Sequence, residues 1–217
     1  MEIIASFVDL VLHLDTHLVA MVAEYGAWIY AILFAVIFSE TGFVVTPFLP
    51  GDSLLFVAGA VAAAGGMDIH LLAVVLMLAA ILGNTVNYAI GRWLGRHFFT
   101  KRGSRWLNPA HLDKARAFYE HHGGKAVVIS RFLPIVRTYV PFVAGMGSMD
   151  WMRFSAFNAA GAVLWVASLC YAGYFFGNVP WIRGNLTLII VGIVVVSLLP
   201  LAWAWLRSRA VRTRRGA

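Results

Sequence analysis

The chain has 217 residues, of which 61% are hydrophobic and 12% charged. A soluble domain of this length needs more polar surface, and several apolar runs approach the roughly 20 residues that cross a bilayer, so we expect an integral membrane protein. The formal net charge of +7 would fit a soluble nucleic-acid binder, but here the basic residues flank membrane segments, so membrane topology explains them better and no nucleic-acid partner is expected.

The basic residues are all in one part of the chain. All 17 Lys and Arg residues lie at or after Arg92, whereas residues 1–91 carry acids but no Lys or Arg. The positive-inside rule therefore places the block 92–105 and the C-terminal tail in the cytoplasm. The basic tail, residues 207–217, is expected to contact anionic lipids.

The N-terminal segment, residues 3–24, mixes acids and histidines with apolar side chains. It predicts an amphipathic helix that either lies on the outer surface or spans the membrane poorly.

The next apolar segment, residues 27–64, is interrupted by the stretch FSETGFVVTPFLPGDSLLFVAG. Its first arm, residues 27–39, gives about 20 Å of helix, which is shorter than a bilayer core of about 30 Å. Between the arms lie two acids, Glu40 and Asp52. Prolines remove backbone donors and glycine favours a turn, so we predict two half-helices joined by a broken tip, a re-entrant hairpin that enters and leaves on the outer side. The tip also contains Pro47, Pro50 and Gly51.

Residues 69–90 predict a full transmembrane span. Asn84, Asn87 and Tyr88 follow the helical spacing i, i+3 and i+4, so they form one polar stripe that faces protein rather than lipid. Hydrogen bonding between helices is the expected role of this stripe.

Residues 108–122 predict a cytoplasmic amphipathic helix, with Asn108 as its cap and Pro109 at its first position. A second broken stretch follows within residues 125–150, SRFLPIVRTYVPFVAGMG. Because the flanking basic residues are cytoplasmic, we predict a re-entrant hairpin that enters from the cytoplasm. The residues that interrupt it are Arg131, Pro134, Arg137 and Pro141.

Residues 155–176 and 186–206 predict two further spans. The expected fold is thus an all-α integral membrane protein in a single membrane domain. It contains two oppositely oriented re-entrant hairpins of broken helices, about three full transmembrane helices and two amphipathic interfacial helices. Such inverted repeats bring their broken tips together near the membrane midplane, so the tip acids and tip arginines should face each other.

These four charged residues are the candidate site. Removal from water favours the protonated form of a carboxyl group, so Glu40 and Asp52 are the expected proton-coupling residues. Arg131 and Arg137 stay charged and could bind a phosphate group through paired donors. A simpler reading is that the four residues form ion pairs that only stabilise the fold.

No motif for covalent chemistry is present. The chain contains no Walker A motif, no HExxH and no GxSxG, so we expect a transporter rather than an enzyme, with no cofactor and no metal.

Several motifs together resemble the DedA family of bacterial inner-membrane proteins: FSETGFVVTPFLPGDSLLF, GNTVNYAIGR, YEHHGGKAVVISRFLPIVRTYVPFVAGMG and NAAGAVLWV. The resemblance covers nearly the whole chain. It implies a multi-pass protein of the bacterial inner membrane, with two re-entrant hairpins and kinship to eukaryotic VTT-domain lipid scramblases.

The resemblance also implies a function. Members of the family are implicated in returning undecaprenyl phosphate, the lipid carrier of cell-wall synthesis, across the membrane, and in proton-motive-force homeostasis. The functionally important acids of the family match Glu40 and Asp52, and its arginines match Arg131 and Arg137. Similar sequences often have an aspartate where this chain has Asn84, so Asn84 is expected to support the site rather than to carry protons.

Three hypotheses follow. The first is a flippase that moves an anionic lipid phosphate, with undecaprenyl phosphate and protons as its partners. The second is a proton-coupled transporter of small ions or oxyanions that supports membrane potential and pH homeostasis. The third is a non-transporting assembly factor whose charges are structural. The sequence is also compatible with a homo-oligomer.

Overall fold

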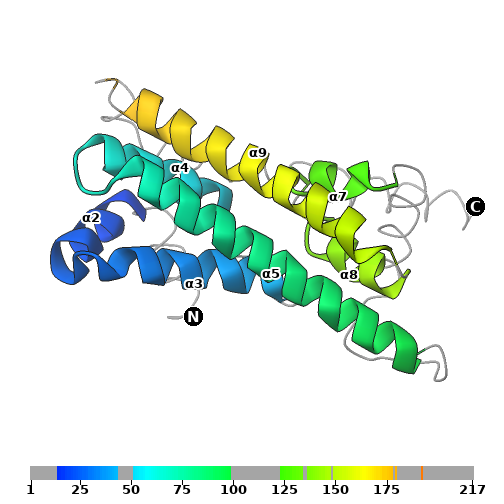
Figure 1. The fold of residues 1–217 in the computed structure, drawn as a ribbon. Helices are drawn as coiled ribbons and strands as arrows, with labels where there is room; N and C mark the ends of the chain where they lie inside the picture. Colours follow the sequence, from blue (N-terminus) through cyan, green and yellow to red (C-terminus); the bar gives the residue numbers. More distant parts are fainter. Residues whose placement is uncertain are drawn as a thin grey trace, which may run out of the picture.

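A computed structural model describes residues 14–43, 51–98, 123–133, 136–147 and 149–177, together with the single residues 179 and 192. All regular secondary structure in this part of the chain is helical, which confirms the expected all-α class there. Figure 1 shows the arrangement of the helices. They are α2 (Leu14–Tyr25), α3 (Trp28–Gly42), α4 (Gly51–Ala63), α5 (Ile69–Phe98), α7 (Lys125–Ser130), α8 (Tyr139–Met146) and α9 (Trp151–Gly177).

Two helices are long and apolar enough to cross a membrane, Ile69–Leu94 within α5 and α9 itself. They contain the predicted spans 69–90 and 155–176. In Figure 1 they run antiparallel and side by side along the molecule, and their contacts support this arrangement. Large apolar side chains of both helices are exposed, as expected for surfaces that face lipid. On α5 they include Leu71, Val74, Leu78 and Leu82.

The two predicted hairpins coincide with pairs of short helices. Helices α3 and α4 fall within residues 27–64, and α7 and α8 fall within residues 125–150. Helix α2 covers the second half of the predicted N-terminal helix. The predicted span 186–206, the predicted helix 108–122 and the tail 207–217 lie outside the described residues.

In each pair of short helices, one helix packs against α5 and the other packs against α9. Helix α3 packs against α5, the long helix that follows it, whereas α4 packs mainly against α9. In the second pair the pattern is reversed, because α7 packs against α9 and α8 packs against α5. Each pair therefore contacts both long helices, with one short helix packed against each of them.

Glycines allow the closest of these contacts. A Cβ atom on Gly59 of α4 would overlap the backbone of Cys170 on α9, and one on Gly173 of α9 would overlap the backbone of Phe56. At the other crossing, a Cβ on Gly145 of α8 would overlap the backbone of α5 at Tyr88. The helix axes approach as closely as they do because these positions lack side chains.

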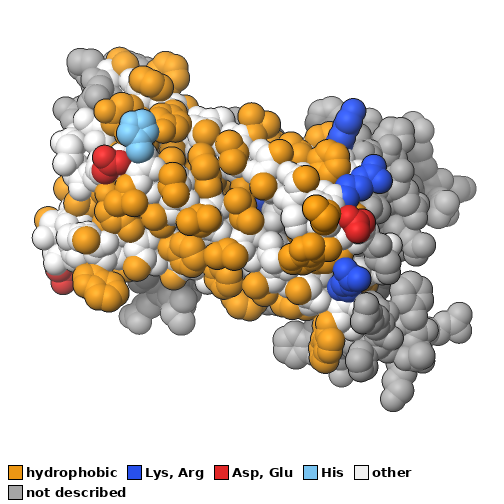
Figure 2. All heavy atoms as spheres, in the orientation of Figure 1, with side chains coloured by type: hydrophobic (Ala, Val, Ile, Leu, Met, Phe, Trp, Pro, Cys, Tyr) orange, Lys and Arg blue, Asp and Glu red, His pale blue; other side chains and the backbone are white. Residues whose placement is uncertain are grey.

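Charged side chains lie at opposite ends of the molecule. Glu24, Asp68 and His70 are exposed near the α2 end, whereas Lys125 and Arg153 are exposed at the other end. Figure 2 shows a broad apolar surface between these ends, with the basic side chains gathered at one of them. Among the described residues, the exposed Lys and Arg side chains thus lie at one end of the molecule, together with the exposed Asp150.

Two apolar cores occupy the interior. One includes Ile37, Leu55, Leu76 and Val166, and joins α3, α4, α5 and α9. The other centres on Tyr88 and joins α5 with α7, α8 and α9; here the rings of Tyr88 and Phe154 stack with their centroids 4.2 Å apart. Buried polar residues, such as Glu40, Asn84, Arg131 and Arg137, lie on the helices that form these two cores.

Candidate functional site

Glu40 lies in the last turn of α3 and is fully buried. The helix ends two residues later, because Phe43 adopts an extended backbone with φ −109° and ψ 124°. Glu40 is thereby held at the end of the first arm, beside the start of α4. A full charge at such depth requires a partner.

Gly51 and Asp52 begin α4. A Cβ atom on Gly51 would overlap the carboxylate of Glu40, so the absence of a side chain makes room for that carboxylate. Asp52 lies in the first turn of the helix, where the unpaired backbone N–H groups favour negative charge. The two acids of the first broken stretch are thus neighbours in space.

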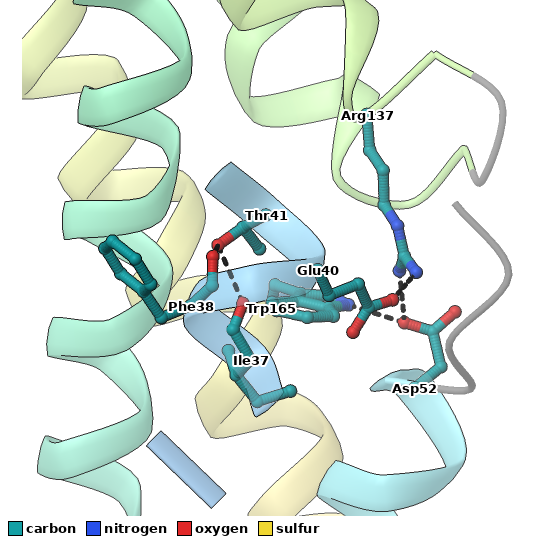
Figure 3. A network of polar contacts seen from close by, with 7 residues as sticks. All are labelled: Ile37, Phe38, Glu40, Thr41, Asp52, Arg137 and Trp165. Carbon is teal, nitrogen blue, oxygen red and sulfur yellow. Dashed lines mark hydrogen bonds and ion pairs between the residues drawn. The ribbon is translucent and has the colours of Figure 1, made fainter. Parts of the chain in front are cut away.

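Arg137 is the partner of both acids. Its Nη2 forms an ion pair with Glu40 Oε1, and its Nη1 lies 3.1 Å from Asp52 Oδ1. Figure 3 shows the guanidinium group between the two carboxylates, which come from different helices. Arg137 is 85 positions from Asp52 and 97 positions from Glu40 in the chain, and the fold brings the three residues together. This contact confirms that a tip arginine faces the tip acids; the transport roles of these residues stay predictions.

Trp165 of α9 completes this cluster, and the sequence reasoning missed it. Its indole N–H donates to Asp52 Oδ1 at 2.9 Å, the same oxygen that Arg137 contacts. The ring centroid lies 5.6 Å from the guanidinium carbon of Arg137 and 5.9 Å from that of Arg131, within cation–π range. A tryptophan inside an apolar span needs a partner for its N–H, and this could have signalled its role.

Arg131 also lies close to Trp165, but its partners differ from those expected. It is 3% exposed, and its Nη2 donates to Asn158 Oδ1 at 2.6 Å and to the carbonyl of Ala80 at 3.3 Å. Within the described chain it forms no ion pair with an acid. The reason is its position at the end of α7, against the face of α9 that carries Asn158.

The polar stripe on α5 faces protein, as predicted. With its amide oriented to satisfy its neighbours, Asn84 accepts from Arg131 Nη2 at 3.0 Å and donates to the Thr41 carbonyl at 3.3 Å. Asn87 Nδ2 donates to the carbonyls of Thr138, at 2.8 Å, and Thr41, at 3.3 Å. Its contacts therefore join the last turn of α3 to the start of α8.

The other predicted supporting residues are placed as follows. The hydroxyl group of Tyr88 donates to the Met149 carbonyl and so ties α5 to the start of α9. Pro141 is buried in the first turn of α8, where a missing N–H leaves no helix hydrogen bond unmade. Pro47, Pro50 and Pro134 lie outside the described residues.

A small cavity lies at the centre of this cluster. Its volume of about 10 Å³ is room for about one water molecule. It is lined by Thr41, Asn84, Arg131, Arg137, Thr138 and Trp165.

The donors around this cavity are not all used. Arg131 Nε, Arg137 Nε and the Thr138 hydroxyl group are buried without a hydrogen-bond partner. Buried polar groups are rarely left unpaired unless a site needs them. Among the described residues, no group of three or more His, Cys, Asp or Glu side chains could hold a metal ion. The buried atoms without a partner also include two acceptors, Glu40 Oε2 and Asn87 Oδ1. The site is therefore a polar cluster in which two guanidinium groups lie close to two carboxylates.

These features define an all-helical membrane protein with a buried cluster of charges between two apolar cores. Residues 49–175 match the family model of the VTT domain, and the chain belongs to this family, the DedA family. It is 54% identical over 202 residues to Protein DedA of Escherichia coli K12, covering 92% of each chain. It is 39% identical to Inner membrane protein YqjA of the same strain, covering 70% of this chain and 69% of the relative.

An uncharacterized membrane protein of Mycobacterium leprae is 42% identical, covering 81% of this chain and 80% of the relative. No solved structure matches the chain significantly.

Proposed function

We propose that this protein is a flippase that carries the phosphate head group of an anionic lipid, undecaprenyl phosphate, across the inner membrane. The observation that carries the proposal is Arg137, buried and held by two carboxylates from separate helices. Ion pairs at this depth are costly to build, and they are rare in membrane proteins unless they serve a pathway. The lipid tails would stay in the bilayer, so only the head group needs a polar route.

The exchange of partners would work as follows. A phosphate group that reaches Arg137 competes with Glu40 and Asp52 for the same guanidinium donors. A carboxylate that loses its arginine while still buried becomes easier to protonate. Phosphate binding and proton uptake would therefore be linked, with Glu40 and Asp52 as proton acceptors and Arg131 and Arg137 as phosphate ligands.

The membrane arrangement is part of the proposal. Helices α3 and α4 would form one re-entrant hairpin and α7 and α8 a second one of opposite orientation. In each pair, the first helix packs against the long helix that follows that pair and the second helix packs against the other long helix, and this supports such an inverted repeat. The end that carries Lys125 and Arg153 would face the cytoplasm, as would the C-terminal tail, which would contact anionic lipids. The name of the relative YqjA, an inner membrane protein, supports this location.

One observation favours a second candidate, a proton-coupled transporter of small ions or oxyanions. The cavity beside the arginines has room for about one water molecule, far less than a lipid head group occupies. The flippase therefore requires the cluster to open, whereas a small ion needs less movement. A lateral opening toward lipid in another conformation would favour the flippase.

The test is to reconstitute the purified chain in liposomes that contain undecaprenyl phosphate. The rate at which inner-leaflet head groups become accessible outside is measured with and without a pH gradient. The proposal predicts acceleration that Arg137→Ala and Arg131→Ala abolish and a matched surface change, Arg153→Ala, leaves intact. No acceleration by folded protein would refute the flippase and make ion flux the next measurement. Full activity of either cluster variant would refute the binding role of that arginine.

A further inference from the structure

Three short motifs occur twice in the chain. They are AVIFSE (35–40) and AVVISR (126–131), FVAG (56–59 and 142–145), and Met-Asp (67–68 and 149–150). One copy of each lies in residues 27–98, which we call the first half, and the other lies in residues 123–177, the second half. The motifs follow the same order in both halves, as expected if both are copies of one unit.

The repeated motifs also occupy equivalent places in the structure. Asp68 and Asp150 cap α5 and α9, because each carboxylate accepts from the backbone N–H three residues later, at 2.8 and 3.0 Å. Counted from these caps, Gly91 and Gly173 hold the same position. A Cβ atom on either glycine would overlap the backbone of the FVAG phenylalanine that crosses it. The long helices run antiparallel (Figure 1), so the second half repeats the first in the opposite direction.

At the candidate site, the repeat exchanges acids for arginines. Glu40 ends the motif AVIFSE, whereas Arg131 ends AVVISR. Asp52 lies seven residues before the glycine of its FVAG motif, and Arg137 lies eight residues before the glycine of the other. Glu40 thus corresponds to Arg131, and Asp52 corresponds to Arg137. Each carboxylate of the first half has a guanidinium group as its counterpart in the second.

This correspondence gives each ion pair a counterpart. The contact of Arg137 with Asp52 joins two corresponding residues, so it is its own counterpart. The ion pair of Glu40 with Arg137 corresponds to a pair of Arg131 with Asp52. The structure has the first of these two pairs and not the second, because Arg131 donates instead to neutral groups such as the side chain of Asn158. The two halves are thus alike in backbone and unlike in pairing.

Trp165 accounts for this difference. Counted from the caps, its counterpart on α5 is Gly83, which has no side chain. The indole N–H of Trp165 donates to Asp52 at 2.9 Å, and the ring centroid lies 5.9 Å from the guanidinium carbon of Arg131. Arg131 and Asp52 therefore both contact one side chain, and a movement of this ring decides whether they meet.

We propose that the protein has a second state in which the halves exchange their pairing: Arg131 joins Arg137 on Asp52, and Glu40 is released from its arginine. In transporters built from inverted repeats, one repeat moves against the other around a central site. Each half can then adopt the arrangement that its copy had before. This exchange would be the alternating step of the proposed flippase, and to that extent it rests on the proposed function.

The exchange moves the unpaired charge from an arginine to an acid. In the structure, the buried guanidinium group of Arg131 has neutral partners, and an arginine cannot lose its proton. In the second state, the group without an ion pair is Glu40, which is fully buried and can become neutral by taking up a proton. Acidification should therefore favour the second state.

The surroundings of Glu40 make it the proton acceptor in preference to Asp52. Its charged neighbours are Asp52 of α4 and Arg137, whereas α5 and α9 bring the neutral side chains of Asn84 and Trp165 to the cluster. Helix α2 lies at the other end of α3 (Figure 1). The Asp52 side chain is 21% exposed, and the indole N–H stabilises its charged form. Glu40 has neither advantage once Arg137 leaves it.

A double-mutant cycle tests the new pair. Glu40→Gln imitates the protonated acid, so the full chain with this replacement should occupy the second state in detergent. Arg131→Gln and Asp52→Asn are compared singly and together by the equilibrium constant of unfolding in denaturant. Their effects should be coupled by about tenfold or more in the Glu40→Gln background, and by less than about threefold with Glu40 present at alkaline pH. In the control cycle, Arg153→Gln replaces Arg131→Gln and should show no coupling in either background.

Infrared spectroscopy gives a second measurement, on folded protein with single replacements. The C=O stretching band of a protonated carboxyl group that Glu40→Gln removes reports on Glu40. If the cluster is fixed, Arg131→Gln removes a nearby positive charge, so this band should appear at higher pH than in the original chain. The exchange predicts the opposite. Arg131→Gln removes the ion pair that the second state gains, so the band should require a proton concentration about threefold higher or more.

Either measurement can overturn the exchange. Coupling that is absent from both backgrounds, or equal in both, would refute it, and so would a band that appears at higher pH in folded Arg131→Gln. If a variant of the cycle does not fold, the infrared result decides. Neither measurement contains undecaprenyl phosphate. Exchange in a protein that moves no lipid would therefore refute the flippase alone, and lipid movement without exchange would refute the second state alone.

Discussion

Arg137 and Arg131 are six residues apart and both buried, yet their surroundings are opposite in kind. Arg137 faces two carboxylates from α3 and α4, whereas the side chains that contact Arg131, on α5 and α9, are neutral. Trp165 lies against both guanidinium groups. One arginine is thus held by acids of the chain itself, and the other is held by neutral amide and carbonyl groups of the described residues.

The largest effect on stability is expected for Arg137. Arg137→Gln leaves the buried Glu40 and the partly exposed Asp52 without their cation, and breaking a buried ion pair typically costs about 3–5 kcal/mol. Denaturant titration in detergent should show this loss in the free energy of unfolding. Arg153→Gln, which alters an exposed arginine of α9, is the matched control and should change it by less than about 0.5 kcal/mol. Equal stability of both variants would mean that the ion pairs contribute nothing.

The second-largest loss of stability is expected for Gly51, which lies next to the cluster. Gly51→Ala introduces a Cβ atom into the space that the Glu40 carboxylate occupies, and overpacking of this kind costs about 1–3 kcal/mol. The control is Gly147→Ala, whose Cβ would meet its nearest atom, the Val143 carbonyl oxygen, at 3.2 Å. Melting temperatures in detergent compare the two. A larger loss at Gly147 than at Gly51 would show that the carboxylate does not need this space.

The hydrogen bond from Trp165 to Asp52 should have a smaller effect. Trp165→Phe keeps an aromatic ring against both arginines but removes the N–H donor, which costs about 1 kcal/mol for a typical hydrogen bond. Trp165→Leu also removes the ring, so it should cost more. If the two variants are equally stable, the ring contributes no cation–π stabilisation to the cluster.

A smaller change in stability than at Arg137 is expected for Arg131. Arg131→Gln removes a buried cation that forms no ion pair with a described acid, but it also removes the donor of three hydrogen bonds. The loss in the free energy of unfolding should therefore be about 1–2 kcal/mol, less than for Arg137→Gln. Transport should nevertheless be lost, because the phosphate loses a ligand. The same liposome measurement applies, with unfolding followed in parallel. A loss of stability as large as that of Arg137→Gln would contradict the difference between the two sites.

The contact of Arg137 with Glu40 and Asp52 could be predicted from the sequence. Short apolar arms, prolines and charged residues in an apolar segment leave the chain few ways to fold in a membrane. Asn84, Asn87 and Tyr88 could be assigned to a protein-facing stripe from their spacing alone. Trp165 of α9 was missed because an apolar helix does not reveal which face meets the site. Even so, Asn158 and Trp165 are seven residues apart, two turns on one face of a helix, so their shared orientation was present in the sequence.

The sequence pattern could not show which of the two arginines pairs with the acids and which with neutral groups. Arg131 and Arg137 both follow the same short helix within seven residues. Their different partners depend on how α7 and α8 pack on α9 and α5, which is a property of the tertiary structure.

The most direct test of the central claim is transport by a charge-neutral double variant, Glu40→Gln with Arg137→Gln. The double variant leaves only Asp52 without its arginine. Because the Asp52 side chain is 21% exposed and keeps its hydrogen bond from Trp165, the loss of stability should be smaller than for Arg137→Gln alone, and the chain should fold. We predict that this folded variant moves no undecaprenyl phosphate in liposomes. Transport at the original rate would show that the charges are only structural and would contradict the account.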